Sequence, residues 1–301
     1  MKRAKRLIVN ILSVPLTLVA LPLSLIPLMV IRALNPIVSF LAFRIIGYRK
    51  QVVFDNFRKA FPEMNQSERE RLAKGYYKHL ASLILDTIGF ISLRKSTVKK
   101  LGSFKKDDIR TIDQYYSQQK SIILAMSHFG SWEVLGAVFN QRFPGYSVAG
   151  YRPLTNKVVD AVIYYSRKRL NNLLVPTKKL ARKTLEMVNA KQPFALMLIS
   201  DQWPPPANAT WVDFMGIKTP FYNGLEKLSR KFDLPVVFIS TRKNENGTYS
   251  IFTNEITNEP KSLPQGEITR RYAGLLENEI KNQPEYWLWS HRRWKAAPEK
   301  T

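Results

Sequence analysis

The chain has 301 residues, of which 45% are hydrophobic, so it can bury a full core and is not generally disordered. It contains no cysteine, which excludes disulfides, thiolate nucleophiles and cysteine-based metal sites. Its formal net charge of +24 favours an anionic partner, which can be nucleic acid, an acidic membrane surface, or an acidic protein or substrate.

The N-terminus carries an uncharged apolar run, Leu7–Ile31, directly after a cluster of basic residues. The run is longer than the ~20 residues that cross a hydrocarbon core, and the basic cluster favours a cytoplasmic N-terminus. Three prolines interrupt the run, so a bent, re-entrant or interfacial segment is an alternative, and a secretory signal peptide is another. We predict a membrane anchor over residues 1–34, followed by one α/β domain over residues 35–301.

The stretch Pro36–Tyr48 is apolar but interrupted by Arg44, and we expect it to lie on the membrane surface as an amphipathic segment. The remaining chain is itself basic, which favours attraction to anionic headgroups. The sequence contains no zinc-finger spacing, no RNP-like aromatic strand and no convincing helix-turn-helix signal. We therefore predict an anionic membrane as a partner and no nucleic acid.

Beyond this stretch the pattern is helical to about residue 110, with a clear amphipathic helix from Ser67. Short apolar runs then alternate with helical segments. The predicted strands are Ser121–Met126, Tyr146–Gly150, Leu173–Val175, Phe194–Ile199, Val236–Ser240 and Thr248–Thr253; the predicted helices are Trp132–Arg142, Asn156–Leu170, Thr177–Lys191, Leu225–Phe232 and Glu267–Lys281. This alternation predicts an α/β fold with a mostly parallel central sheet flanked by helices.

A histidine and a glutamate follow the first buried strand in the order His-x4-Glu. His128 comes just after the strand and Glu133 lies in the first turns of the next helix. In such a pair, one imidazole nitrogen can accept a proton from a substrate hydroxyl while the other donates to the carboxylate. The alternative is structural: His128 caps the helix, and Glu133 is a first-turn acid favoured by the helix dipole.

Other catalytic arrangements have less support in the sequence. Ser127 and Ser131 flank His128, but neither lies in the Gly-x-Ser-x-Gly pattern of a nucleophile elbow. The three histidines lack metal-ligand spacing, so we expect no metal and no cofactor. Of the other two, His79 is expected to be structural, and His291 has no adjacent acid.

Several motifs that occur together make the chain resemble the late acyltransferases of lipid A biosynthesis, the lauroyl and myristoyl transferase family. The motifs follow the family order over nearly the whole chain. They are Tyr48-Arg49-Lys50, Asn56-Phe57, Phe61-Pro62-Glu63, Ser127–Glu133, Tyr151-Arg152-Pro153, Arg167-Lys168-Arg169, Ser200-Asp201-Gln202, Phe214-Met215-Gly216 with Thr219-Pro220, and Trp287–Lys295.

The resemblance implies a glycerol-phosphate-acyltransferase-like fold and assigns catalysis to His128 and Glu133, with Arg167 and Asp201 also required. It implies a one-step transfer from acyl carrier protein to a hydroxyl of a lipid A precursor, without an acyl-enzyme. The cytoplasmic face of a bacterial inner membrane is the implied location. Another glycolipid or a lysophospholipid is an alternative acceptor. A basic membrane-anchored scaffold without catalytic activity is the alternative outside enzymes.

A set of basic residues is predicted to bind the substrate or the carrier protein, with a plain solvated surface as the alternative for Arg152 and for the cluster around Lys178. The set is Arg152, Arg169, Lys178, Lys179, Arg182, Arg292 and Arg293. Arg167 is expected to bind a phosphate or the developing negative charge, and Asp201 to orient Arg167 or a lipid-binding loop. Trp287, Trp289 and Trp294, with Arg292 and Arg293, are candidates for an aromatic belt at the membrane interface, and some of these tryptophans are expected to lie in the core.

Overall fold

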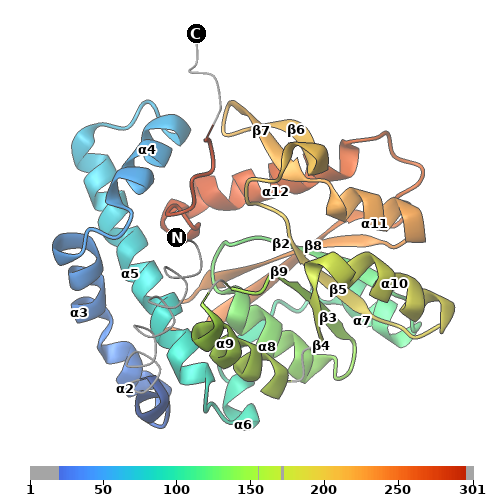
Figure 1. Cartoon of the computed structure of the whole chain (residues 1–301), viewed down its shortest axis with the longest axis horizontal. Helices are drawn as coiled ribbons and strands as arrows, with labels where there is room; N and C mark the ends of the chain where they lie inside the picture. Colours follow the sequence, from blue (N-terminus) through green and yellow to red (C-terminus); the bar gives the residue numbers. More distant parts are fainter. Residues whose placement is uncertain (1–19, 155, 171–172, 296–301) are drawn as a thin grey trace.

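The computed structural model describes residues 20–154, 156–170 and 173–295 (Figure 1). Most of the predicted anchor, residues 1–19, therefore lies outside the described residues. In the described part, the apolar run is interrupted at Pro27, which precedes the six-residue helix α2 (Leu28–Ala33). No helix within the described ranges combines the length and the apolar character that crossing a membrane requires.

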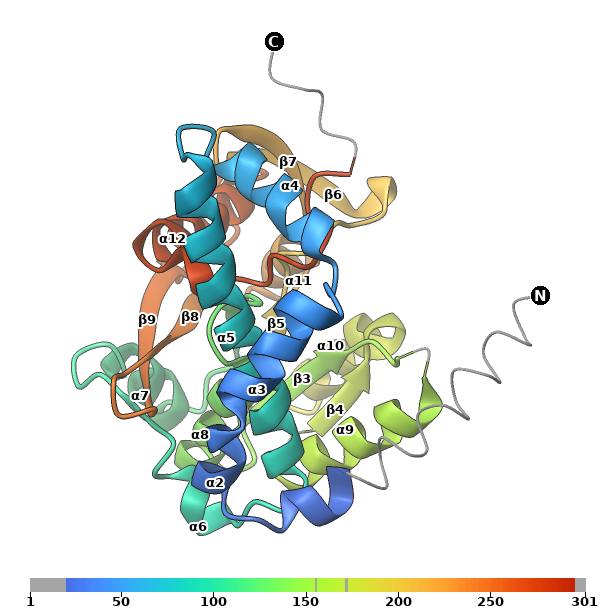
Figure 2. The same cartoon turned by 90° about the vertical axis from the view of Figure 1, so that its left-hand side faces the viewer.

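A group of helices near the N-terminus packs against one side of the sheet domain. It consists of α2, α3 (Asn35–Phe40), the π-helical turn η1 (Leu41–Ile45), α4 (Lys50–Ala60) and α5 (Gln66–Phe90). Figure 2 shows α2, α3 and α4 alongside the long helix α5. Asn65 begins α5 with a capping box in which its side chain accepts from the Glu68 N–H and Glu68 accepts from the Asn65 N–H. The predicted helix from Ser67 is therefore confirmed.

The central sheet has seven strands in the order β1-β9-β8-β2-β5-β3-β4. The strands are β1 (Gly102–Phe104), β2 (Ile122–Met126), β3 (Ser147–Tyr151), β4 (Leu173–Pro176), β5 (Ala195–Ile199), β8 (Val236–Lys243) and β9 (Tyr249–Thr257). All neighbouring pairs are parallel except β8 and β9. The predicted mostly parallel sheet is confirmed.

Helices between the strands cover both faces of this sheet (Figure 1). They are α6 (Lys95–Val98), α7 (Arg110–Ser117), α8 (Trp132–Arg142), α9 (Lys157–Arg169), the 3-10 turn η2 (Thr177–Lys179), α10 (Leu180–Asn189), α11 (Gly224–Phe232) and α12 (Glu267–Asn282), followed by the turn η4 (Pro284–Tyr286). Strand β2 is buried throughout, and its alternate residues point into two hydrophobic cores on opposite faces of the sheet. Ile123 packs in the core with α11 and α12, and Leu124 packs in the core with α8. This two-sided burial explains why the strands are continuous apolar runs.

The structure also contains elements that the sequence pattern did not predict. β1 and α7 lie where we expected helix or no defined element. A hairpin of β6 (Ala209–Phe214) and β7 (Ile217–Tyr222) forms a separate two-stranded sheet. Met215 and Gly216 form its turn with φ of 53° and 70°, which is the left-handed backbone that a tight hairpin needs at both central positions.

Candidate active site

Two neighbouring parallel strands bring His128 and Asp201 together. Met126 at the end of β2 pairs with Ile199 at the end of β5, and both functional residues lie two positions further along. The Asp201 carboxylate accepts from the His128 backbone N–H at 2.8 Å, and its other oxygen lies 2.7 Å from His128 Nδ1. From the sequence we expected Asp201 to orient Arg167 or a lipid-binding loop, whereas its partner in the structure is the imidazole.

The Asp201 carboxylate is fixed as an ionised acceptor. It is 2% exposed, and Trp287 Nε1 donates to it at 2.8 Å. Burial acts to raise the pKa of Asp201, but the His128 charge and the hydrogen bonds from His128 and Trp287 more than offset this and hold the pKa at about 2. Because an ionised carboxylate can only accept, Nδ1 of neutral His128 carries the proton and Nε2 carries the lone pair.

Glu133 does not make the hydrogen bond to His128 that the sequence analysis expected. Its carboxylate binds the Arg167 guanidinium instead, with Arg167 Nε at 3.1 Å and Nη2 at 2.5 Å. Burial acts to lower the pKa of Arg167, but the adjacent Glu133 carboxylate, through its charge and its hydrogen bonds together, has the larger opposite effect. The pKa of Arg167 is therefore raised overall. The forked pair joins the first turn of α8 to the last turn of α9.

An apolar cavity of about 70 Å³ lies beside this ion pair, between the sheet and helices α8 and α9. Glu133 and Arg167 line it on the polar side. The rest of the wall is mainly apolar and includes Phe90, Met126, Trp132, Ala149, Leu170 and Met197. Trp132 also packs edge-on against the His128 ring, with centroids 5.0 Å apart, so the cavity adjoins the imidazole.

The C-terminal segment and β8 hold the loop that carries His128. The Gly130 N–H donates to the Tyr286 carbonyl at 2.9 Å, and the Ser131 N–H donates to Thr241 Oγ1 at 2.8 Å. Gly130 has φ of 61°, and a Cβ there would lie 2.3 Å from the Thr241 carbonyl oxygen. Only glycine fits this contact, so the loop conformation is fixed by packing.

Gln202 is a site residue that the sequence analysis quoted only within a motif and gave no role. Its Nε2 lies 3.3 Å from His128 Nε2. Because the imidazole Nε2 carries the lone pair, the amide N–H₂ is the donor in this contact. A sequence signal existed, since Gln202 directly follows Asp201 at the end of a buried strand.

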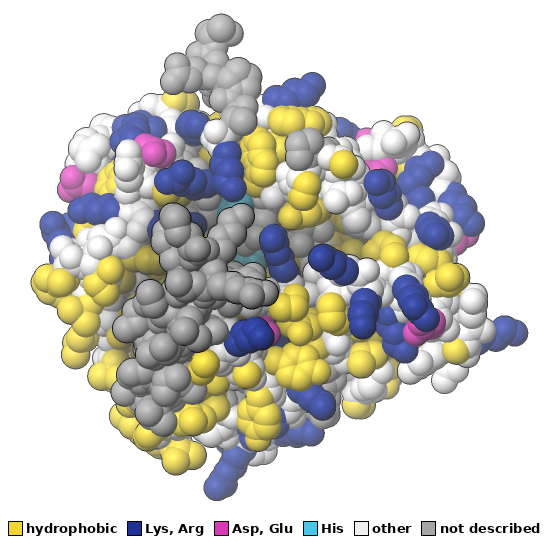
Figure 3. All heavy atoms as spheres, viewed as in Figure 1, with side chains coloured by type: hydrophobic (Ala, Val, Ile, Leu, Met, Phe, Trp, Pro, Cys, Tyr) yellow, Lys and Arg dark blue, Asp and Glu magenta, His cyan; other side chains and the backbone are white. Residues whose placement is uncertain are grey.

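Three of the predicted basic residues lie at the same carboxyl edge of the sheet as His128. Arg152 follows β3, while Lys178 and Lys179 follow β4 on η2, and all three are exposed. Arg182 lies further along on α10, exposed and paired with Glu186. In Figure 3 a histidine is visible in a hollow of this face, with Lys and Arg side chains around it.

The remaining predicted basic residues have different surroundings. Arg169 donates to the Leu93 carbonyl between α5 and α6, and Arg292 is exposed. Arg293 is 1% exposed, and its guanidinium lies 4.4 Å from the Phe221 ring centroid. As placed, Arg293 does not reach a surface headgroup, and burial lowers its pKa to about 10.

The candidate aromatic belt is also wrong for the residues named. The side chains of Trp287, Trp289 and Trp294 are all buried. They pack on one another and on Phe214, where the C-terminal segment crosses the core. Their role is therefore structural, and Trp287 additionally anchors Asp201.

Comparison with known proteins gives matches along nearly the whole chain. The family model described as bacterial lipid A biosynthesis acyltransferase matches residues 5–296. The lipid A biosynthesis palmitoleoyltransferase of Escherichia coli is 25% identical over 275 residues, covering 87% of this chain and 86% of the relative. The lipid A biosynthesis lauroyltransferase of Escherichia coli is 24% identical over 264 residues, with coverages of 86% and 83%. A lipid A biosynthesis acyltransferase of Haemophilus influenzae is 22% identical over 260 residues, with coverages of 84% and 80%.

Proposed function

The chain belongs to the bacterial lipid A biosynthesis acyltransferase family, and we propose that it moves a fatty acyl chain from acyl carrier protein to a hydroxyl of a lipid A precursor. The observation that carries this proposal is the His128–Asp201 pair beside an apolar cavity. The carrier protein as donor and the exact acceptor are inferred from the family and from the chemistry of the site.

The geometry supports general-base catalysis by His128. Nε2 takes the proton of the acceptor hydroxyl while the hydroxyl oxygen attacks the thioester carbonyl carbon, forming a C–O bond and an oxyanion. Asp201 accepts from Nδ1 and stabilises the imidazolium that results. Collapse of the intermediate breaks the C–S bond, and the thiolate takes the proton back from Nε2. No acyl-enzyme is needed.

In this proposal Glu133 does not accept a hydrogen bond from His128 but acts together with Arg167. Their forked ion pair closes the polar side of the cavity, so we infer that it positions the thioester group while the acyl chain enters the apolar part. The exposed Arg152, Lys178 and Lys179 at the same edge provide positive charge for an acidic carrier protein or a phosphorylated lipid.

An association with the cytoplasmic face of the inner membrane is part of the proposal. The support is a set of exposed apolar side chains on and beside α2, α3 and η1, and these helices pack against α5. The set is Leu25, Met29, Val30, Ile37, Phe40, Ile45 and Ile46, each more than half exposed. Contiguous exposed apolar surface of this kind marks an interaction site, and a bilayer suits it when basic residues lie nearby.

The test of this function is a mass-spectrometric acyl-transfer assay with wild type and His128→Ala. Detergent-solubilised protein would be offered acyl carrier proteins of several chain lengths and a panel of lipid A precursors, other glycolipids and lysophospholipids. We expect transfer to a lipid A precursor by the wild type and a loss of about 10²–10⁴ in rate for His128→Ala, because the general base is removed. Equal rates for both proteins would exclude His128 as the base. Transfer only to another acceptor would reassign the substrate.

The apolar cavity predicts a change in acyl-chain preference. Ala149 and Met197 are paired in register on β3 and β5 and both line the cavity. We expect Ala149→Leu to shift products to shorter chains and Met197→Ala to longer ones, with about tenfold or more discrimination for each methylene that no longer fits. Competition among carrier proteins of mixed chain length measures this. An unchanged product distribution in both variants would mean that the chain binds elsewhere.

A further inference from the structure

The oxyanion of the proposed reaction needs hydrogen-bond donors, and three of the backbone N–H groups around His128 are already engaged. Backbone N–H groups or a nearby cation are general candidates for this role. In the structure, the N–H of His128 donates to Asp201, that of Gly130 to Tyr286, and that of Ser131 to Thr241. These three donors hold the loop, and a side-chain donor beside the imidazole is a candidate for the oxyanion.

Gln202 is the side-chain donor in direct contact with the base. Its amide nitrogen lies 3.3 Å from His128 Nε2, the atom that must accept the hydroxyl proton. The side chain is half-buried, and its backbone is tied to Asp201, the residue that orients the imidazole. Arg167 is a charged alternative that lines the adjoining cavity, but its Nε and Nη2 are bonded to Glu133.

From this geometry we propose that Gln202 is a catalytic residue whose amide N–H stabilises the oxyanion of the acyl-transfer step. The inference rests on the proposed function. Without substrate, the amide occupies the position beside Nε2 where the acceptor hydroxyl binds. The hydroxyl displaces it, and an amide moved by the width of one oxygen atom remains within reach of the adjacent thioester carbonyl. A neutral donor suits this position because it strengthens its bond as negative charge develops.

The neighbouring residues described above orient His128 but do not donate to the oxyanion, which leaves that role to the Gln202 amide. Asp201 already fixes the tautomer of His128 through a 2.7 Å contact, so the imidazole does not need Gln202 for that purpose. The Gln202 amide is neutral, so it does not compete with the Arg167 guanidinium for the Glu133 carboxylate. Donation to the reacting carbonyl is the remaining chemical use of its N–H groups.

The test compares Gln202→Met, Gln202→Glu and the control Gln192→Met in the acyl-transfer assay described above. Methionine keeps the length of the side chain without donors, and Gln192 is an exposed residue before β5. We expect Gln202→Met to lower kcat by about 10²–10³ with little change in KM, as for loss of one oxyanion donor. Gln202→Glu, which is isosteric but cannot donate when ionised, should be at least as slow, while Gln192→Met should match the wild type.

Two results would overturn the assignment. One is a Gln202→Met protein that keeps kcat within a few-fold of the wild type. The other is a loss that appears in KM alone, which is the signature of ground-state binding. Thermal unfolding of each variant separates either result from misfolding, and the polar Gln202→Glu provides a second variant if the methionine protein is unstable. Absence of transfer by the wild type would instead reject the proposed function on which this inference rests.

Discussion

Replacing Asp201 with asparagine is expected to lower kcat by about 10³–10⁴ while the protein still folds. The corresponding aspartate-to-asparagine change in serine protease triads costs about 10⁴, because the amide stabilises the wrong imidazole tautomer. The same physics applies here. An asparagine amide that donates to Nδ1 leaves the proton on Nε2, so His128 loses the lone pair with which it accepts the hydroxyl proton.

The measurement is kcat for Asp201→Asn beside Asp213→Asn, a control on the exposed side of β6. Asparagine can still accept from Trp287 Nε1 and from the His128 N–H, so the loop should remain in place. The control should retain full activity. If Asp201→Asn keeps more than about a tenth of the wild-type kcat, the carboxylate does not set the state of His128 and the mechanism proposed above is wrong.

The low pKa of Asp201 also gives a prediction for the pH dependence of stability. The pKa falls from 3.8 to about 2 on folding, so the ionised carboxylate stabilises the folded state at pH values above 3.8. That contribution should be lost only as the pH falls from about 4 towards 2, and it should be missing in Asp201→Asn. Acid unfolding curves of the two proteins should therefore converge at low pH.

Much of the sheet and part of the site could be predicted because parallel strands leave clear signals. A strand buried on both faces must be apolar throughout, which is why β2 and β5 could be recognised as short uninterrupted runs. The end of β2 then marked His128 as a candidate, with Glu133 in the helix that follows. The family resemblance added Arg167 and Asp201, and Arg167 lies with Glu133 beside the cavity.

The pairing of these residues could not be predicted, because it depends on strand order rather than on spacing. Glu133 is only five positions from His128, but the first turn of α8 directs its carboxylate towards Arg167 on α9. Asp201 is 73 positions away, yet the pairing of β2 with β5 brings its carboxylate within 2.7 Å of the imidazole. Spacing along the chain favoured Glu133 as the partner of the imidazole, whereas the structure places Asp201 there.

Buried charges were missed for a related reason. Arg293 lies in a basic segment and was interpreted as a surface residue, but the β6–β7 hairpin covers it with Phe214 and Phe221. The hairpin itself gave only a weak signal, since Met215-Gly216 is not one of the common tight-turn pairs. An aspartate within the long helix α5, Asp86, was likewise given no role.

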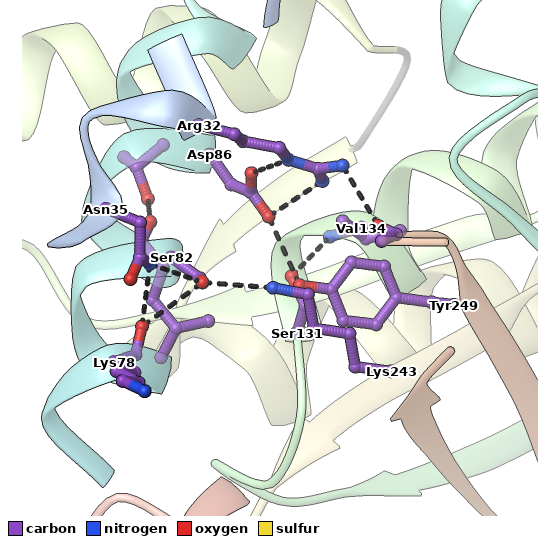
Figure 4. Close-up of polar contacts among 12 residues, drawn as sticks. Arg32, Asn35, Lys78, Ser82, Asp86, Ser131, Val134, Lys243 and Tyr249 are labelled. Carbon is purple, nitrogen blue, oxygen red and sulfur yellow. Dashed lines mark hydrogen bonds and ion pairs between the residues drawn. The ribbon is translucent and has the colours of Figure 1, made fainter. Parts of the chain in front are cut away.

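Asp86 is the centre of a polar network that joins the N-terminal helices to the loop carrying His128 (Figure 4). Arg32 from α2 forks onto its carboxylate at 2.7 and 3.1 Å and also donates to the Gly247 carbonyl at 3.0 Å. The Tyr249 hydroxyl lies 3.3 Å from the same carboxylate and is hydrogen-bonded to Ser131, the N-cap of α8. Asp86 is completely buried, so this is an ion pair in a low-dielectric environment.

We therefore expect Asp86→Asn to lower the free energy of unfolding by about 3 kcal/mol, because it leaves the partly buried Arg32 guanidinium without its counter-charge. The partly buried Lys243 near the same carboxylate adds a second cation to the unbalanced cluster. Urea unfolding measures the change through its midpoint. The control is Asp55→Asn, which breaks an ion pair whose two side chains are 54% and 44% exposed and should cost less than about 1 kcal/mol.

A double replacement separates the loss of the ion pair from the loss of packing. Removing both charges with Arg32→Met and Asp86→Leu replaces the pair with apolar side chains, and such replacements are often neutral or stabilising. The double variant should therefore be more stable than Asp86→Asn alone, although it lacks more polar contacts. If instead it is the less stable of the two, the carboxylate matters mainly as an acceptor for Tyr249, and the network stabilises the N-terminus of α8 through that hydroxyl rather than through charge balance.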